Sequence, residues 1–176
     1  MNFSLSIDRR HALRLLLYLT AVTAFYVVFA AVGSVWGGAA GAINVLPFLT
    51  AAIAFYDGPY TGGAFGFYGG MLMSLASTTV DGADALILGL FGIVCGSLGV
   101  VFMRRILPSV IYCGTVLLAL RGVISATYYR LFYAIPFTRV LLSYVVIILV
   151  SLAPGAAGYF VIRAIHGRFS GEEDIL

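Results

Sequence analysis

Apolar residues along this chain occur in long runs that are separated by short polar or glycine-rich breaks. A helix that crosses a membrane needs roughly 20 largely apolar residues, because at ~1.5 Å rise per residue that length spans a hydrocarbon core of about 30 Å. Lipid offers the backbone no hydrogen-bond partners, so runs of this length favour continuous helices. The pattern predicts an all-α fold with six transmembrane helices in one compact bundle. The expected helices cover residues 11–32, 42–56, 60–79, 85–103, 108–132 and 140–162.

Composition supports this membrane interpretation. Hydrophobic residues make up 62% of the 176 positions and charged residues only 10%, with a mean hydropathy of +1.07, whereas an average soluble domain is about 25% charged. The breaks are short and no second zone of composition appears, so we expect a single polytopic membrane domain over residues 1–176. Only the tails, about residues 1–10 and 167–176, have a soluble character.

The distribution of arginine predicts the orientation of the chain. With six spans, the N-terminus, the breaks near residues 57 and 104–105, and the C-terminus share one side of the membrane. Basic residues in short loops are retained in the cytoplasm, so we expect both termini to be cytoplasmic. No basic patch is interleaved with exposed aromatic residues, so no nucleic-acid partner is expected. The shared side carries Arg9, Arg10, Arg104, Arg105, Arg163 and Arg168, and the opposite side carries Arg130 and Arg139.

Two of the expected helices carry stripes of small residues. Residues 57–74 read DGPYTGGAFGFYGGMLMS, with a small residue at every fourth position, and residues 89–99 read GLFGIVCGSLG. Residues four apart share a helix face, and small residues there let two backbones approach closely in lipid. We therefore predict that these two helices pack on each other, the alternative being a groove for a partner's transmembrane helix. The stripes consist of Gly58, Gly62, Gly66, Gly70 and Ser74, and of Gly89, Gly92, Gly96 and Gly99.

Catalytic chemistry is poorly supported by the sequence. The two histidines, His11 and His166, fall at the expected cytoplasmic ends, so we predict no catalytic cluster or metal site within the membrane. Asp81 and Asp84 are three apart and could act as an acid and a base. The segment TTVDGADALILG is more typical of a helix N-terminus, where the helix dipole favours acids. We therefore expect no enzyme and no cofactor.

Arg121 is the residue that helix packing explains least well. It falls near the middle of the fifth run, where a charge costs at least about 2.5 to 3.5 kcal/mol and indicates a functional site by default. No acid is expected at a comparable depth, so the functional interpretation is a partner's carboxylate or a lipid-linked anionic group that reaches Arg121. The alternative is that the helix ends near Leu120 and that RGVISATYYRLFYAI lies partly in the membrane interface.

Several of these segments together carry a resemblance to a known family. The segments NVLPFLTAAIAFYDGPYTGGAFGFYGGMLMSL and SLAPGAAGYFVIRAIHGRF, with the small-residue helix between them, resemble the bacterial rod-shape-determining protein MreD. That family has a proline in its second helix, a glycine-phenylalanine pattern in its third, and a proline late in its sixth before a basic tail. The matching positions are Pro47, Gly66, Phe67, Gly70 and Pro154.

The resemblance implies a function and also shows one departure. Where the family commonly has an acid at the end of the pattern in the third helix, this chain has Ser74. The resemblance implies a non-enzymatic scaffold in the bacterial cytoplasmic membrane that binds a single-span MreC-type partner. Through that partner it would meet the peptidoglycan-elongation machinery, namely an MreB-like filament, a transpeptidase and a RodA-type glycosyltransferase.

A transporter subunit is the main alternative. MreD proteins are similar in fold to the substrate-binding subunits of energy-coupling-factor vitamin transporters. Such a subunit typically has an alanine pair at four-residue spacing in its first helix, whereas the alanines here are at 12, 21, 24, 30 and 31, and no two of them are four apart. The expected external face also offers few polar side chains to form a substrate pocket. We therefore favour the scaffold.

Overall fold

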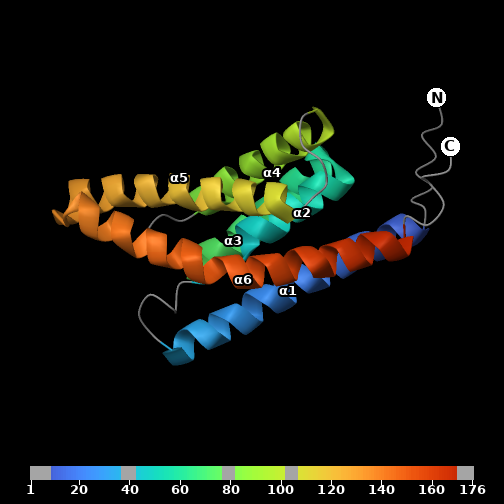
Figure 1. Cartoon of the computed structure of the whole chain (residues 1–176), viewed down its shortest axis with the longest axis horizontal. Helices are drawn as coiled ribbons and strands as arrows, with labels where there is room; N and C mark the ends of the chain where they lie inside the picture. The colour runs from blue at the N-terminus through green and yellow to red at the C-terminus, as the bar shows by residue number, and fades with distance from the viewer. Residues whose placement is uncertain (1–8, 37–42, 77–81, 102–106, 170–176) are drawn as a thin grey trace.

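The computed structural model describes residues 9–36, 43–76, 82–101 and 107–169, and its regular elements within these ranges are all α-helices. Figure 1 shows that the helices run roughly along one long axis. The all-α prediction is confirmed, and each expected run overlaps one helix. The helices are α1 (Arg9–Trp36), α2 (Leu46–Asp57), α3 (Pro59–Ala76), α4 (Ala83–Val101), α5 (Leu107–Tyr133) and α6 (Phe137–Phe169).

Three of these helices are long and apolar enough to cross a membrane. They are His11–Val32 within α1, Leu107–Tyr133 of α5, and Phe137–Arg168 of α6. These helices indicate a membrane protein. The second expected span is shorter than predicted, because α2 has 12 residues and is about 18 Å long at ~1.5 Å per residue. A helix of that length cannot cross a core of about 30 Å by itself, so the six-span bundle stays a prediction.

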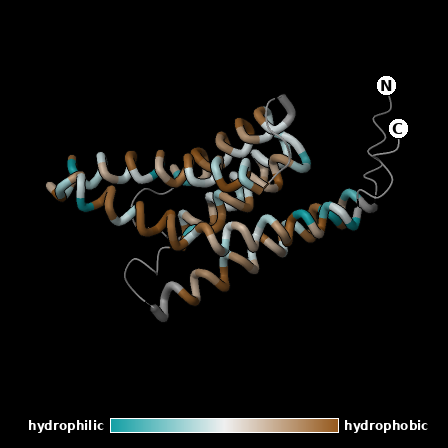
Figure 2. The backbone as a smooth tube through the Cα atoms, viewed as in Figure 1, coloured by the Kyte–Doolittle hydropathy of each residue, from teal (hydrophilic) through white to brown (hydrophobic). Residues whose placement is uncertain are grey.

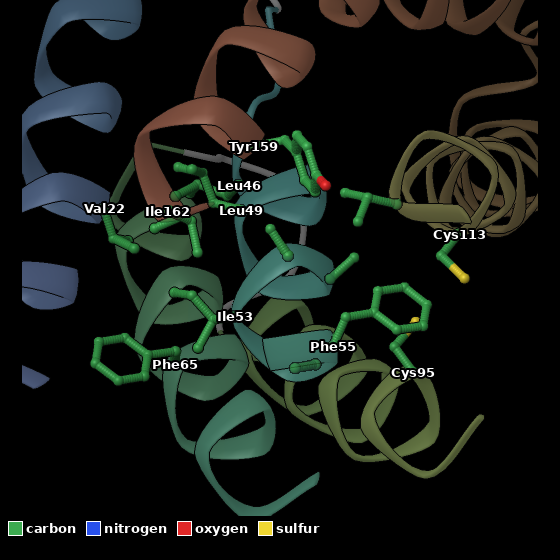
Figure 3. Close-up of a cluster of buried hydrophobic side chains, with 14 of the residues drawn as sticks. Val22, Leu46, Leu49, Ile53, Phe55, Phe65, Cys95, Cys113, Tyr159 and Ile162 are labelled. Carbon is green, nitrogen blue, oxygen red and sulfur yellow. The ribbon is translucent and has the colours of Figure 1, made fainter. Parts of the chain in front are cut away.

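Helix α2 forms the centre of the core. Every residue from Leu46 to Phe55 is buried, as expected for a helix that is apolar all round, and α2 contacts each of the other five helices. Pro47 lies in its first turn, where the missing N–H of proline costs no helical hydrogen bond. Figure 3 shows side chains of α2 surrounded by those of the neighbouring helices.

A left-handed glycine joins α2 to α3. Gly58 has φ +87°, a conformation that a residue with a Cβ adopts only with strain. Its backbone N–H donates a hydrogen bond to the Ala54 carbonyl at 3.0 Å, which closes the last turn of α2. Because α3 begins directly at Pro59, the two helices meet in a tight corner.

Different helix ends meet at the two ends of the molecule. The start of α1, the end of α2 and the end of α6 lie together, since Asp57 is 3.3 Å from Arg14 and 3.4 Å from His166. Helices α5 and α6 form a hairpin whose tip lies at the opposite end of the long axis (Figure 1). Figure 2 shows hydrophilic positions towards both ends and mainly apolar positions between them. Residues 1–8 and 170–176 of the predicted tails and the Arg104–Arg105 pair lie outside the described residues, whereas residues 9–10 and 167–169 belong to α1 and α6.

Candidate functional site

The two glycine stripes face each other, as predicted. An added Cβ would come within 3.0 Å of the backbone of the opposite helix at five stripe glycines, namely Gly62, Gly66, Gly70, Gly92 and Gly96. Real Cβ atoms almost never approach so closely, so only glycine permits this contact. The stripes are therefore used inside the chain, and α3 and α4 leave no room between them for a partner's helix. The close pairs are Gly92 with the Gly62 backbone, Gly66 with the Leu88 carbonyl, and Gly70 with the Ala85 backbone.

The first glycine of the α3 stripe has a different role from the one predicted. Gly58 lies before α3, at the end of α2, and an added Cβ there would meet nothing within 4 Å. Its positive φ, rather than a close helix contact, is what requires glycine at this position. Gly96 of α4 does pack against this corner, against the backbone of Pro59 and Gly58.

The remaining small residues make looser or different contacts. A Cβ on Gly89 would lie at an ordinary distance of 3.4 Å from the Cβ of Phe67. Gly99 faces the ring of Phe55 on α2 rather than α3. Ser74, at the position where the MreD family commonly has an acid, donates its hydroxyl to the Gly70 carbonyl at 3.0 Å. Its hydroxyl is therefore bonded within α3.

Arg121 pairs with an acid of its own chain, which corrects the sequence prediction. Its guanidinium Nη2 donates a hydrogen bond to Asp84 Oδ2 at 2.7 Å, and the two side chains are 19% and 12% exposed. The prediction failed because the first turn of α4, which holds Asp84, lies beside the middle of α5. Helix α5 also continues unbroken to Tyr133, so the alternative in which it ends near Leu120 is wrong.

The position of Asp84 agrees with the helix-terminus interpretation. Asp84 lies in the first turn of α4, where the positive end of the helix dipole favours a carboxylate. The same carboxylate binds Arg121, so one acid stabilises the helix end and compensates the charge on α5. Asp81, the other member of the candidate acid–base pair, lies outside the described residues.

A second polar cluster, near the start of α1, was missed by the sequence analysis. Asp57, whose side chain is only 3% exposed, has its Oδ1 3.3 Å from the Arg14 Nη2 and 3.4 Å from the His166 Nδ1. These residues come from the end of α2, the start of α1 and the end of α6. We call them, with the three tyrosines below, the Asp57 cluster.

Three tyrosines surround this charged centre. The Tyr18 hydroxyl is 3.4 Å from His166 Nδ1, and the Tyr56 ring lies 4.8 Å from the His166 ring, centroid to centroid. Tyr56 donates its hydroxyl to that of Tyr159 at 3.0 Å. Within the described part of the chain, the Arg14 Nε and the Asp57 Oδ2 are buried without a hydrogen-bond partner. The buried charges are thus paired, but not every polar atom is satisfied.

The Asp57 cluster joins three helices through its charged side chains. It contains one carboxylate, one guanidinium and one imidazole, and among the described residues no group of three or more His, Cys, Asp or Glu is placed to hold a metal ion. Ionisable groups inside membrane proteins are costly and usually pair with one another. The sequence contained one usable signal, because the predicted topology already placed Arg14, residue 57 and His166 towards the same side.

The chain matches no protein-family model, no curated protein and no solved structure. The MreD resemblance therefore rests on its sequence motifs. Four of the five motif residues are at least partly buried: Pro47 in α2, Gly66 and Gly70 between α3 and α4, and Pro154 within α6. The fifth, Phe67 on α3, is 42% exposed.

Proposed function

We propose that this protein is a non-enzymatic membrane scaffold of the cell-wall elongation machinery, in the manner of MreD, and that it binds a single-span MreC-type partner. The resemblance supplies the functional class. The observation that carries the proposal is the contrast among the motif residues: Gly66 and Gly70 form the contact between α3 and α4, whereas Phe67 projects from the packed unit and is free to meet a partner. In a family of scaffolds, a motif residue on the outer surface is a natural candidate for partner binding.

Phe67 stands in the middle of an exposed stripe along α3. The stripe has the three- and four-residue spacing of a single helix face, and it combines large apolar side chains with a small one. In lipid, helices associate through close packing and not through a hydrophobic driving force, and such a surface lets a partner's helix interlock with it. The stripe consists of Tyr60, Ala64, Phe67, Met71 and Leu75, of which Tyr60 is 92% and Leu75 83% exposed.

The proposal predicts a specific loss of partner binding in Phe67→Ala. The full-length protein is purified in mild detergent together with a candidate single-span, coiled-coil membrane protein, and recovery of the partner is measured by quantitative immunoblot. Phe67→Ala should reduce recovery about tenfold, as expected for a central aromatic contact. Phe160→Ala is the matched control, because Phe160 is a similarly exposed phenylalanine on α6, 56% against 42%.

Two outcomes would contradict the proposal. Equal recovery with Phe67→Ala and wild type would remove the α3 stripe as the binding face. Recovery of an ATP-binding module and its membrane partner, in place of a single-span protein, would favour the substrate-binding transporter subunit. Melting temperatures of the three proteins, measured in the same detergent, show whether a loss of binding reflects a loss of fold.

A further inference from the structure

A cavity opens between the helices beside Arg121. It has a volume of about 320 Å³ and is lined from five elements: α1, the start of α2, α3, α5 and α6. This volume lies at the lower end of the range for pockets that hold small molecules. The three longest lining helices are the ones able to cross a membrane, so the cavity is placed to receive a molecule from the bilayer.

The cavity has an apolar wall and a few polar groups. Phe25, Phe29, Met73 and Leu118 supply much of the apolar surface. Arg121, Asn44, Tyr26 and Tyr144 supply the polar groups. The Tyr144 hydroxyl is 2.9 Å from that of Ser125, whereas the side chains of Asn44 and Tyr26 make no hydrogen bond to any described residue. A small number of polar groups in an apolar pocket is the usual arrangement of a ligand site.

Arg121 retains hydrogen-bonding capacity towards this cavity. A guanidinium has five N–H donors, and the described residues accept one hydrogen bond from Arg121, that of Asp84. Asp84 does not line this cavity but a second, smaller one of about 80 Å³, whereas Arg121 lines both. The carboxylate therefore binds the arginine from one side, and the larger cavity approaches it from another.

We propose that this cavity binds an amphiphile with one apolar chain and an anionic phosphate or carboxylate head, which Arg121 holds. The apolar wall covers the chain, and the remaining guanidinium donors bind the head oxygens with the Asn44 amide. Charge-assisted hydrogen bonds to such oxygens are among the strongest available to a protein. The cavity lies apart from Phe67, so this site does not depend on the proposed scaffold function.

The test compares two probes that differ only in the head group. The full-length protein in phosphatidylcholine nanodiscs is titrated with dodecyl phosphate or with dodecanol, and one-to-one complexes are counted by native mass spectrometry. Wild type should bind dodecyl phosphate at least about tenfold more tightly than dodecanol. The double variant Asp84→Asn with Arg121→Gln removes both charges of the pair together and should lose this preference.

A second pair of variants tests the position of the site. Ala30 lines the cavity and is exposed, whereas Ala24 is an exposed alanine on the same helix that does not line it. Ala30→Trp should weaken dodecyl phosphate binding about tenfold or more by filling the cavity, and Ala24→Trp should leave it unchanged. Equal binding of both probes to wild type, undiminished binding in Ala30→Trp, or an undiminished preference in the double variant would overturn the proposal.

Lipid extraction distinguishes two sources of the same head-group chemistry. If the bilayer supplies the ligand, an anionic lipid should co-purify with wild type in about equimolar amount and be depleted in the double variant and in Ala30→Trp. If the ligand is a free amphiphile, no such lipid should co-purify, while dodecyl phosphate still binds. Either result agrees with the site, provided that the variants and the two probes behave as stated.

Discussion

At the scale of single residues, charge pairing organises this protein. Arg121 binds Asp84 at 2.7 Å, and Asp57 lies between Arg14 and His166 with its side chain almost completely buried. Burial of a charge is costly unless an opposite charge compensates it. Each pair joins helices that are distant in sequence, so these contacts fix helix positions while they satisfy the charges.

The Arg121–Asp84 pair predicts the stability of its variants. Arg121→Leu alone removes the guanidinium that compensates a mostly buried carboxylate and should destabilise the protein by roughly 3 kcal/mol, a fall of about 6–12 °C in Tm for a chain of this length. Arg121→Leu combined with Asp84→Leu should recover most of this loss, because both charges of the pair are removed together. The measurement is thermal melting in detergent.

Arg130→Leu is the control for this prediction. Arg130 is exposed on the same helix, so its replacement should leave the Tm nearly unchanged. An Arg121→Leu protein that melts at or above the wild-type temperature would show that Asp84 does not compensate the arginine.

At the scale of helices, contact between α3 and α4 depends on the absence of side chains. Gly62, Gly66 and Gly70 lie where a Cβ would collide with the neighbouring helix. The same principle operates around α2, where the Phe48 ring lies against both Gly114 of α5 and Gly155 of α6. Large side chains on one helix and glycine on its neighbours produce the close packing that replaces the hydrophobic effect in lipid.

Replacement of the α3 glycines by leucine should separate the two helices. Gly66→Leu and Gly70→Leu would drive a side chain into the α4 backbone, which cannot yield as a flexible side chain could. We expect a strongly reduced folded yield, measured as the monodisperse fraction by size-exclusion chromatography in detergent.

Two controls separate this effect from a general intolerance of leucine. Gly167→Leu should give a normal yield, because an added Cβ there meets nothing within 4 Å. Met71→Leu should also be tolerated, since Met71 is 50% exposed and the change nearly conserves volume. A normal yield from both Gly66→Leu and Gly70→Leu would mean that α3 and α4 do not touch as described.

At the scale of the whole molecule, the first and the last described helix meet at the same end, where the Asp57 cluster lies. Helix α1 leads away from the Asp57 cluster, α2 ends in it, and α6 ends in it again. Helices α3 and α4 together leave this end and return, since Gly96 of α4 packs against the Pro59 corner. The start of α1 and the end of α6 are therefore neighbours.

Reporter fusions test the resulting topology in cells. Fusions after Leu176 and after Arg105 should report a cytoplasmic location, and a fusion near Ala83 should report an external one, because arginine in short loops stays in the cytoplasm. An external C-terminus would exclude the arrangement in which both ends share the arginine-rich side. Expression of each fusion, measured by immunoblot, is the control for a missing reporter signal.

The sequence by itself determined the helical class, the membrane character and the contact between the two glycine-bearing helices. These properties depend on local features, namely run length, hydropathy and the spacing of small residues, which need no knowledge of distant neighbours. One member of the predicted stripe was misplaced at this level, because the fold places Gly58 at a helix end instead of in the helix contact.

Only the tertiary structure decided which charges meet and where a cavity remains. Arg121 and Asp84 are 37 positions apart, and Tyr18 and His166 are 148 apart, so no local pattern connects them. The depth of a residue in its own helix does not reveal which end of another helix lies beside it. That relation depends on how the short helix α2 is enclosed by the other five, because burial of its whole surface sets the offset between the helices and therefore the pairing of their side chains.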